Sequence, residues 1–300
     1  MTVQDRFSAL EALPFEVSEN SKGRRGAALA SVVEIFQRRE MLGLLVRRDL
    51  KSRYKDSALG FVWSLVRPLT QLFIYYVVIG KFLGAQRGIP DFAIYVFAGL
   101  TIYGLFSEIV SSSTSSIVGN SGLIKKIYLP REVFPLASVG SALFNFGIQL
   151  IILLVATLLL GSFPLDIELL YFFPALLVIV VWGTAFGLLL SAVNVYLRDV
   201  QYLVEVLLLI LLWASPIVYA WQQAKAILGS GILLQIYTDN PITLAVLGFQ
   251  RAMWVKGHDA VAYPDFLLLR LAIAFVVGIV FLLVFQRVFA RLQGNFAQEL

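Results

Sequence analysis

Long uncharged stretches dominate the hydrophobic pattern of the chain. The longest runs from Val133 to Leu165, 33 residues without a charged side chain, and a second runs from Leu169 to Leu197. A helix that crosses a bilayer needs about 20 predominantly apolar residues. A helix also satisfies its own backbone hydrogen bonds, which hydrocarbon cannot do. The pattern therefore predicts an all-α membrane protein.

The same length rule, applied along the whole chain, predicts six transmembrane helices. The expected spans are residues 61–83, 92–116, 133–160, 169–193, 203–220 and 266–287. Pro216 is expected to break the fifth span near the outer face, because proline lacks a backbone donor. The segment 221–250 is apolar but too interrupted for another span, so we expect half-helices that dip into the outer face.

Polar or mixed segments flank the six-span domain, which we place at residues 59–290. Residues 1–30 lack the apolar core of a secretory signal and are expected to form a cytosolic N-terminal tail. Residues 31–58 carry apolar and basic positions at helical spacing, which predicts an amphipathic helix in the inner interface. A simple anchor on anionic lipid explains that pattern equally well. Residues 291–300 are expected to form a cytosolic C-terminal tail.

Basic residues indicate the orientation. With both termini in the cytosol, 18 of the 24 Lys and Arg residues fall on the inner side, as the positive-inside rule favours. Topology therefore explains the net charge of +5 better than nucleic-acid binding does. The chain has no cysteine, which excludes disulfides and thiolate metal sites.

Motifs for an energy source or for catalysis are missing from the sequence. No G-x-x-x-x-G-K-[ST] motif is present to cradle the phosphates of ATP. Ion-coupled carriers usually bury carboxylates or histidine in their spans, but His258 falls in an outer connection and Glu108 is the only carboxylate well inside an expected span. No D-x-D or H-E-x-x-H motif indicates a membrane enzyme. We therefore expect a permease without its own motor; a membrane glycosyltransferase or a scaffold is the alternative.

Four blocks of sequence, taken in order, resemble the membrane subunit of ABC-2 type exporters, specifically the permeases that export O-antigen, teichoic acid and related polysaccharides. The blocks are Leu45–Lys55 with Leu59–Trp63 and Pro68; Gly99–Glu108 with Ser116–Glu132; Tyr196–Val200 through Ser215–Tyr219; and Asn240–Thr243 with a closing helix at Phe285–Phe289 and a basic tail. The likeness covers about residues 40–295 and leaves the first 35 residues outside.

This resemblance implies a type V exporter-like ABC-2 permease in the bacterial inner (plasma) membrane. It implies a homodimer joined to two copies of a separate ABC ATPase, which binds the ATP and Mg²⁺. It also implies that this chain has no cofactor, no metal and no catalytic residue. The implied cargo is a polysaccharide linked to polyprenyl pyrophosphate, such as O-antigen, teichoic acid or galactan. An ABC-2 exporter of lipid or drug is the alternative within transport.

The resemblance names the cytosolic loop 119–132 as a coupling helix that docks into the ATPase. An ATPase moves spans by pushing on a compact element that is joined rigidly to two of them. A plain topology loop is the alternative, but it would need the lysines and not the apolar residues. The residues expected to contact the ATPase are Leu123, Ile124, Lys125, Lys126, Tyr128 and Arg131.

Basic residues before and within the first span are candidates for binding the pyrophosphate of a lipid carrier, because a guanidinium grips phosphate with two donors. The set is Arg48, Arg53 and Arg67. A solvated face, a lipid anchor or ATPase docking are the alternatives. Arg67 is expected to snorkel to the inner interface or to pair with Glu108.

Aromatic residues are candidates for a glycan conduit, because aromatic rings stack on the apolar faces of sugars and Tyr and Trp add a polar group. An aromatic belt at the membrane interface is the alternative for each of them. The conduit set is Trp63, Tyr76, Tyr103, Phe106 and Glu108. An outer gate is expected at Pro216, Tyr219 and Trp221, beside the broken segment 221–250.

Overall fold

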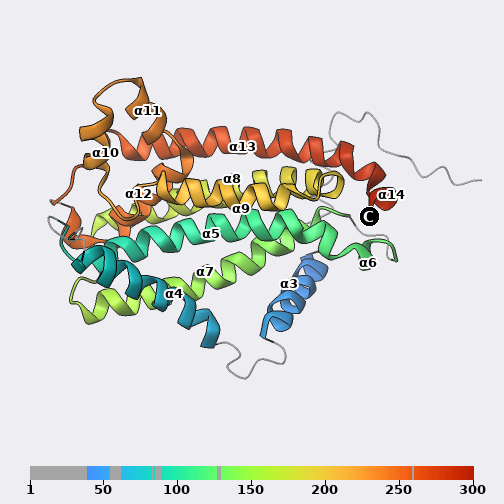
Figure 1. Cartoon of the computed structure of the whole chain (residues 1–300), viewed down its shortest axis with the longest axis horizontal. Helices are drawn as coiled ribbons and strands as arrows, with labels where there is room; N and C mark the ends of the chain where they lie inside the picture. The colour runs from blue at the N-terminus through green and yellow to red at the C-terminus, as the bar shows by residue number, and fades with distance from the viewer. Residues whose placement is uncertain (1–38, 55–61, 83, 85–88, 127–129, 259) are drawn as a thin grey trace, which may run out of the picture. The chain divides into compact units, whose positions relative to one another are not determined.

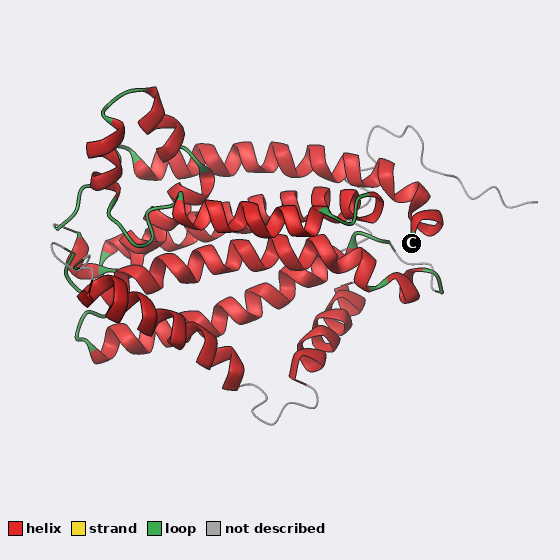
Figure 2. Cartoon of the chain, viewed as in Figure 1, coloured by secondary structure: helices red, strands yellow, loops and turns green. Residues whose placement is uncertain are grey.

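The computed structural model describes residues 39–54, 62–82, 84, 89–126, 130–258 and 260–300, which all belong to one unit of the chain, Arg38–Leu300. Helices and short connections make up these ranges, and no strand occurs in them (Figure 2). The prediction of an all-α protein is confirmed for this part of the chain.

The helices follow one another along the chain as labelled in Figure 1. They are α3 Arg39–Tyr54, α4 Val62–Ile74, a π-helix Tyr75–Phe82, α5 Phe92–Gly119, α6 Ser121–Ile124, α7 Val133–Leu159, α8 Phe172–Tyr196, α9 Val200–Trp213, α10 Trp221–Leu228, α11 Ile232–Thr238, α12 Pro241–Met253, α13 Leu267–Leu292 and α14 Phe296–Glu299, with 3-10 turns at Ile167–Tyr171, Val255–Gly257 and Gln293–Asn295.

Within the described ranges, four helical segments are long and apolar enough to cross a membrane. They are Phe92–Gly119, Val133–Leu159, Ile167–Tyr196 and Leu267–Asn295, and the bent pair α11–α12 adds a fifth if it counts as one broken span. Two of the expected spans are not among these segments. α9 has 14 residues, which is about 21 Å of helix against a hydrocarbon core of about 30 Å, and α4 has 13 before the backbone changes to a π-helix. The protein is therefore a multi-pass membrane protein, and the count of six spans stays a prediction.

α5 is the central helix of the bundle. It contacts α7, α8, α9 and α12 (Figure 1), and 78% of its most apolar window is buried, against 22% for α7 and for α13. α5 is nevertheless the least apolar of the four long spans. A helix that faces lipid must be apolar on its exposed side, whereas a helix surrounded by protein can have its polar groups bonded by its neighbours. The middle of α5 is therefore where this chain places polar side chains.

Small residues let α5, α8 and α13 approach closely. A Cβ atom added to Gly187 on α8 would lie 2.8 Å from the Cβ of Ser113 on α5. On the other side of α8, Gly278 of α13 packs against Trp182, whose indole nitrogen donates a 2.9 Å hydrogen bond to the carbonyl of Ala274. Small residues at such crossings are typical of helix packing in membranes, where dispersion forces and hydrogen bonds replace the hydrophobic effect.

A separate hydrophobic cluster gathers at the end of the bundle that carries the loop after α5. This loop-end cluster joins α3, α5, α7, α8, α13 and α14. Its buried members are Leu45, Ile117, Val133, Phe134, Ala137, Leu188, Ala192, Val195, Phe289 and Phe296. The two sides of the loop, at Ile117 and Val133, are therefore packed into one unit with the C-terminal helices.

α3 packs on the protein. Its residue Leu45 is 7% exposed, and Val46 lies so close to Gly140 of α7 that an added Cβ would be 2.8 Å from its Cγ2. Residues 39–54 are helical, as expected within 31–58, and the position of this helix in the membrane interface stays a prediction; residues 31–38 and 55–58 lie outside the described residues. The basic residues Arg47, Arg48 and Lys51 are exposed on the other side.

The segment 221–250 forms the broken helices that its sequence predicts. α11 and α12 meet at a bend of 68°. Asn240 causes the restart of the helix, because its side chain accepts a 3.0 Å hydrogen bond from the backbone N–H of Ile242 and Pro241 occupies the first helical position. α9 ends at Trp213, three residues before Pro216, as the proline predicts.

Candidate coupling and transport sites

The loop between α5 and α7 combines a packed side with an exposed basic side. Leu123 and Ile124, on the short helix α6, pack against the loop-end cluster. Lys125 and Lys126 are exposed beyond them. Tyr128, which the sequence analysis assigns to the same contact, lies outside the described residues. The described part of the predicted coupling set therefore forms one compact, partly apolar surface.

Arg131 and Glu132 attach the end of this loop to the C-terminal helices. The guanidinium of Arg131 lies 5.7 Å from the ring centroid of Phe296. Glu132 is 3% exposed, at the N-terminus of α7, and accepts a 3.2 Å hydrogen bond from Nε2 of Gln286 on α13. A helix N-terminus favours a negative charge, which helps to hold this carboxylate in the interior. The end of the loop is thus attached both to α7 and to the C-terminal helices α13 and α14.

Arg48 connects α3 to the same loop. Its guanidinium donates hydrogen bonds to Asp49 (2.7 Å) and to the side-chain oxygen of Asn120 (2.8 Å). Asn120 in turn donates a 2.8 Å bond to the carbonyl of Ser116 at the end of α5. Arg53 and Arg67 lie within α3 and α4, but their side chains lie outside the described part of the structure. Of the predicted pyrophosphate set, the structure therefore places Arg48 against the coupling loop.

One face of α5 is polar. Between Ile94 and Ile117, the positions that retain some exposure follow steps of three and four residues, which places them on one side of the helix. They are Gly104, Ser107, Glu108, Ser111, Ser112 and Ser115. This polar face of α5 contrasts with the remaining circumference of the helix, which is buried. Asn145 of α7 flanks it and donates a 2.6 Å hydrogen bond to Glu108.

The predicted conduit residues separate into different environments. Tyr103 and Phe106 are 5% and 2% exposed in the hydrophobic core, and the hydroxyl of Tyr103 donates to the carbonyl of Leu208 on α9. Helix geometry explains why they do not share a face with Glu108: steps of five and two residues turn a helix by about 140° and 200°. Trp63 is 54% exposed on α4, and Lys81 lies 5.1 Å from the ring centroid of Tyr76.

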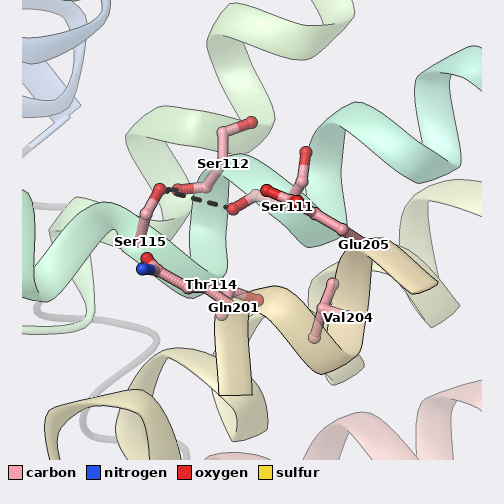
Figure 3. Close-up of a pocket in the computed structure, with 7 residues that line it drawn as sticks. All are labelled: Ser111, Ser112, Thr114, Ser115, Gln201, Val204 and Glu205. Atoms are coloured by element: carbon pink, nitrogen blue, oxygen red, sulfur yellow. Dashed lines mark hydrogen bonds between the residues drawn. The ribbon is translucent and has the colours of Figure 1, made fainter. Parts of the chain in front are cut away.

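A polar pocket opens between α5 and α9 (Figure 3). It has a volume of about 220 Å³. It is lined by Ser111, Ser112, Thr114 and Ser115 from α5 and by Gln201, Val204 and Glu205 from α9. Neither Gln201 nor Glu205 is among the residues predicted from the sequence, because one precedes and the other closely follows residue 203, where the fifth span is expected to begin. Their spacing of four residues in an otherwise apolar helix was the available signal.

The three predicted gate residues lie at the opposite end of the bundle, where Pro216 and Tyr219 share hydrogen-bond partners and Trp221 makes a bond of its own; together we call these contacts the gate network. The hydroxyl of Tyr95 on α5 donates to the carbonyls of Pro216 (2.9 Å) and Tyr219 (2.7 Å). Nε2 of Gln250 on α12 donates a 3.0 Å bond to the same carbonyl of Pro216. The indole of Trp221 donates a 2.9 Å bond to Thr238 on α11. The segment after α9 is thereby fastened to α5, α11 and α12.

This end of the bundle also holds a charged cluster whose residues are not among those predicted from the sequence. Arg251 donates two 2.8 Å hydrogen bonds to Glu168, and its guanidinium lies 4.6 Å from the ring centroid of Tyr171 and 5.3 Å from that of Tyr263. Burial raises the pKa of Tyr263, and the positive charge of Arg251 opposes that shift. Arg251 and Glu168 are 83 residues apart, so no local pattern indicates the pair.

Within the described ranges, no group of three or more His, Cys, Asp or Glu residues lies close enough together to hold a metal ion. The profile of ABC-2 type transporters matches residues 40–254, which includes the coupling loop, the polar face of α5 and the gate network. The chain belongs to the ABC-2 type transporter family.

Curated relatives of this ABC-2 chain match it over most of its length. An O-antigen export system permease protein of Myxococcus xanthus is 30% identical over 220 residues, which is 73% of this chain and 82% of the relative. A protein of the same description from Klebsiella pneumoniae is 26% identical over 262 residues, covering 87% and 95% of the two chains. A polysialic acid transport protein of Escherichia coli is 24% identical over 181 residues, covering 58% and 68%.

Proposed function

We propose that this ABC-2 chain is the transmembrane subunit of an ATP-driven exporter, which moves a polysaccharide linked to polyprenyl pyrophosphate from the cytosol across the bacterial inner membrane. The observation that carries the proposal is the similarity to an O-antigen export system permease over 87% of this chain and 95% of that relative. A likeness of that extent covers the whole transport domain and not one motif.

A separate ATPase supplies the energy in this proposal. The sequence has no phosphate-binding loop of its own. Two copies of the chain join two ATPase subunits, which bind ATP and Mg²⁺. The loop 119–132 receives the motion, because its partly buried Ile124 packs against the loop-end cluster and its Glu132 is bonded to Gln286 on α13. Both termini lie in the cytosol, as the distribution of basic residues favours.

The polar face of α5 favours a glycan over a lipid or a drug as the cargo. Serine hydroxyls and the Glu108 carboxylate gain nothing from contact with acyl chains. They are suited to a path for a chain of hydroxyl groups. We therefore place the conduit along this face, with Trp63 and Tyr76 at its margin and the gate network of Pro216, Tyr219 and Trp221 at its outer end.

Depletion of this chain in its native cells, with the ATPase subunit retained, tests the proposal. We expect finished glycan to accumulate on its lipid carrier inside the cell and to disappear from the surface. Re-expression of the chain should restore display, and re-expression with a hydrolysis-deficient ATPase should not. Normal surface display after depletion would overturn the proposal. In proteoliposomes, stimulation of ATP hydrolysis by a drug and not by the glycan lipid would identify a drug exporter instead.

A further inference from the structure

The pocket between α5 and α9 offers hydrogen-bonding groups that the fold leaves unused (Figure 3). Three of its hydroxyls donate to backbone carbonyls of their own helix: Ser112 to Glu108, Thr114 to Val110 (2.7 Å), and Ser115 to Ser111 and Ser112. Their oxygens still have lone pairs that accept hydrogen bonds. The side chains of Ser111, Gln201 and Glu205 make no hydrogen bond to any other residue that the structure describes.

Glu205 has an unusual position for a carboxylate. It is the sixth residue of α9, a helix whose other side chains are apolar apart from Gln201 and Tyr202, and it is exposed. A charged side chain within a membrane helix is costly and generally faces a water-filled cavity or a functional partner. Gln201 lies one turn earlier and lines the same pocket. Two polar side chains on one stripe of α9 therefore meet the serine-rich face of α5.

The balance of donors and acceptors defines the ligand. The carboxylate of Glu205 can only accept hydrogen bonds, and the hydroxyls of α5 that line the pocket also retain acceptor sites. The side chains of Ser111 and Gln201 can donate hydrogen bonds to a ligand. Such a lining suits a ligand with several hydroxyl donors. A phosphate or a carboxylate offers only acceptors at neutral pH, and the charge of Glu205 repels it. Val204 adds a buried apolar wall for a C–H face. The volume of about 220 Å³ is several times the roughly 30 Å³ share of one water molecule.

We infer that this pocket is a sugar-binding subsite for uncharged units of the transported glycan, and that Glu205 makes it selective against acidic sugars. The inference rests on the proposed function and adds a substrate class to it. Neutral hexoses and N-acetylated amino sugars fit the pocket. Uronic acids, sialic acids and the pyrophosphate of the carrier do not, so recognition of the carrier belongs elsewhere on the chain.

Saturation-transfer NMR on the full chain with its ATPase in lipid nanodiscs tests the inference. The probes are a neutral trisaccharide of mannose and a trisaccharide of galacturonic acid of the same length. The wild-type protein should bind the neutral probe and not the acidic one. Ser111→Val and Gln201→Leu each remove one hydrogen-bonding group, and each should weaken the binding of the neutral probe by about five- to tenfold. Glu205→Gln should allow the acidic probe to bind.

The matched control for Glu205→Gln is Glu299→Gln, which removes the same charge from an exposed position on α14. It should bind both probes like the wild type. Co-purification with the ATPase shows that each variant is folded and assembled. Equal binding of the neutral probe by all variants, or binding of the acidic probe by the wild type, would overturn the subsite.

The two proposals fail separately. Loss of surface glycan on depletion, together with unaltered probe binding by the pocket variants, leaves the export function standing and removes the subsite. Normal display on depletion removes the export function, whatever the pocket binds.

Discussion

Arg48 on α3 donates a 2.8 Å hydrogen bond to the side chain of Asn120, 72 residues further along the chain. The residue chosen from the sequence as a phosphate ligand is therefore attached to the loop chosen for ATPase coupling. The two sites are adjacent elements of one surface.

A double-mutant cycle with Arg48→Ala and Asn120→Ala tests the connection. Polar pairs between membrane helices couple by about 0.6 kcal/mol on average, and Arg48 is half-exposed, so we expect a stability coupling of that order. The measurement is the midpoint of thermal unfolding in detergent for the single and double variants. Fully additive effects would show that the bond contributes nothing, and would leave Arg48 free to act as a phosphate ligand.

Ile124→Asp should abolish association with the ATPase while the chain still inserts in the membrane. The substitution places a charge on the small apolar surface of the coupling loop, which an interface would have to desolvate. Co-purification of the ATPase in equal amounts is the measurement. The control is Ile227→Asp, which adds the same charge to an 85% exposed position on α10. Retained co-purification with Ile124→Asp would remove the coupling role.

Gly187→Val should destabilise the packing of α8 against α5. An added Cβ would lie 2.8 Å from the Cβ of Ser113, and overpacking of this kind typically costs about 1–3 kcal/mol. Gly147→Val on α7 is the matched control, since nothing lies within 4 Å of its added Cβ. The midpoint of thermal unfolding should be lower for Gly187→Val than for Gly147→Val. Adding Ser113→Gly to Gly187→Val should restore part of the lost stability. Equal midpoints for both variants would contradict the close approach.

The sequence predicts the helices better than it predicts what surrounds them. The expected span 133–160 is α7, Val133–Leu159, because a long apolar stretch leaves the backbone no other solution in a bilayer. Pro216 and Asn240 likewise indicate where α9 ends and α12 begins. These are local signals, set by backbone donors and caps within a few residues.

The environment of each side chain depends on partners that are distant in sequence. Tyr103 was expected in a conduit, but its hydroxyl is bonded to Leu208, 105 residues away. The sequence alone does not indicate Glu205 as a site residue, because a carboxylate near the start of a span is typical of the membrane boundary. Its significance comes from the serines of α5 that α9 brings opposite it. Periodicity alone separates the two sides of α5 but does not say which side is open.

If the gate network closes the permease, as we propose, Tyr95→Phe should make the permease leaky. The hydroxyl of Tyr95 holds the carbonyls of Pro216 and Tyr219, and its loss leaves Gln250 as the remaining side-chain donor to Pro216 among the described residues. A segment that follows a broken helix and has lost a donor shared by two of its carbonyls should open more often, because local opening reflects the number of contacts that hold a segment closed. The measurement is passage of a small dye through proteoliposomes without ATP.

Tyr263→Phe is the matched control for that experiment. The hydroxyl of Tyr263 is buried and has no hydrogen-bond partner among the residues that the structure describes, so its removal takes away the same atom without breaking a bond. Dye passage should rise several-fold in Tyr95→Phe and stay at the wild-type level in Tyr263→Phe. The double variant Tyr95→Phe with Gln250→Leu should leak more than either single variant, since Pro216 then loses both donors. If all of these variants remain as tight as the wild type, the network stabilises the fold at this end and does not form a gate.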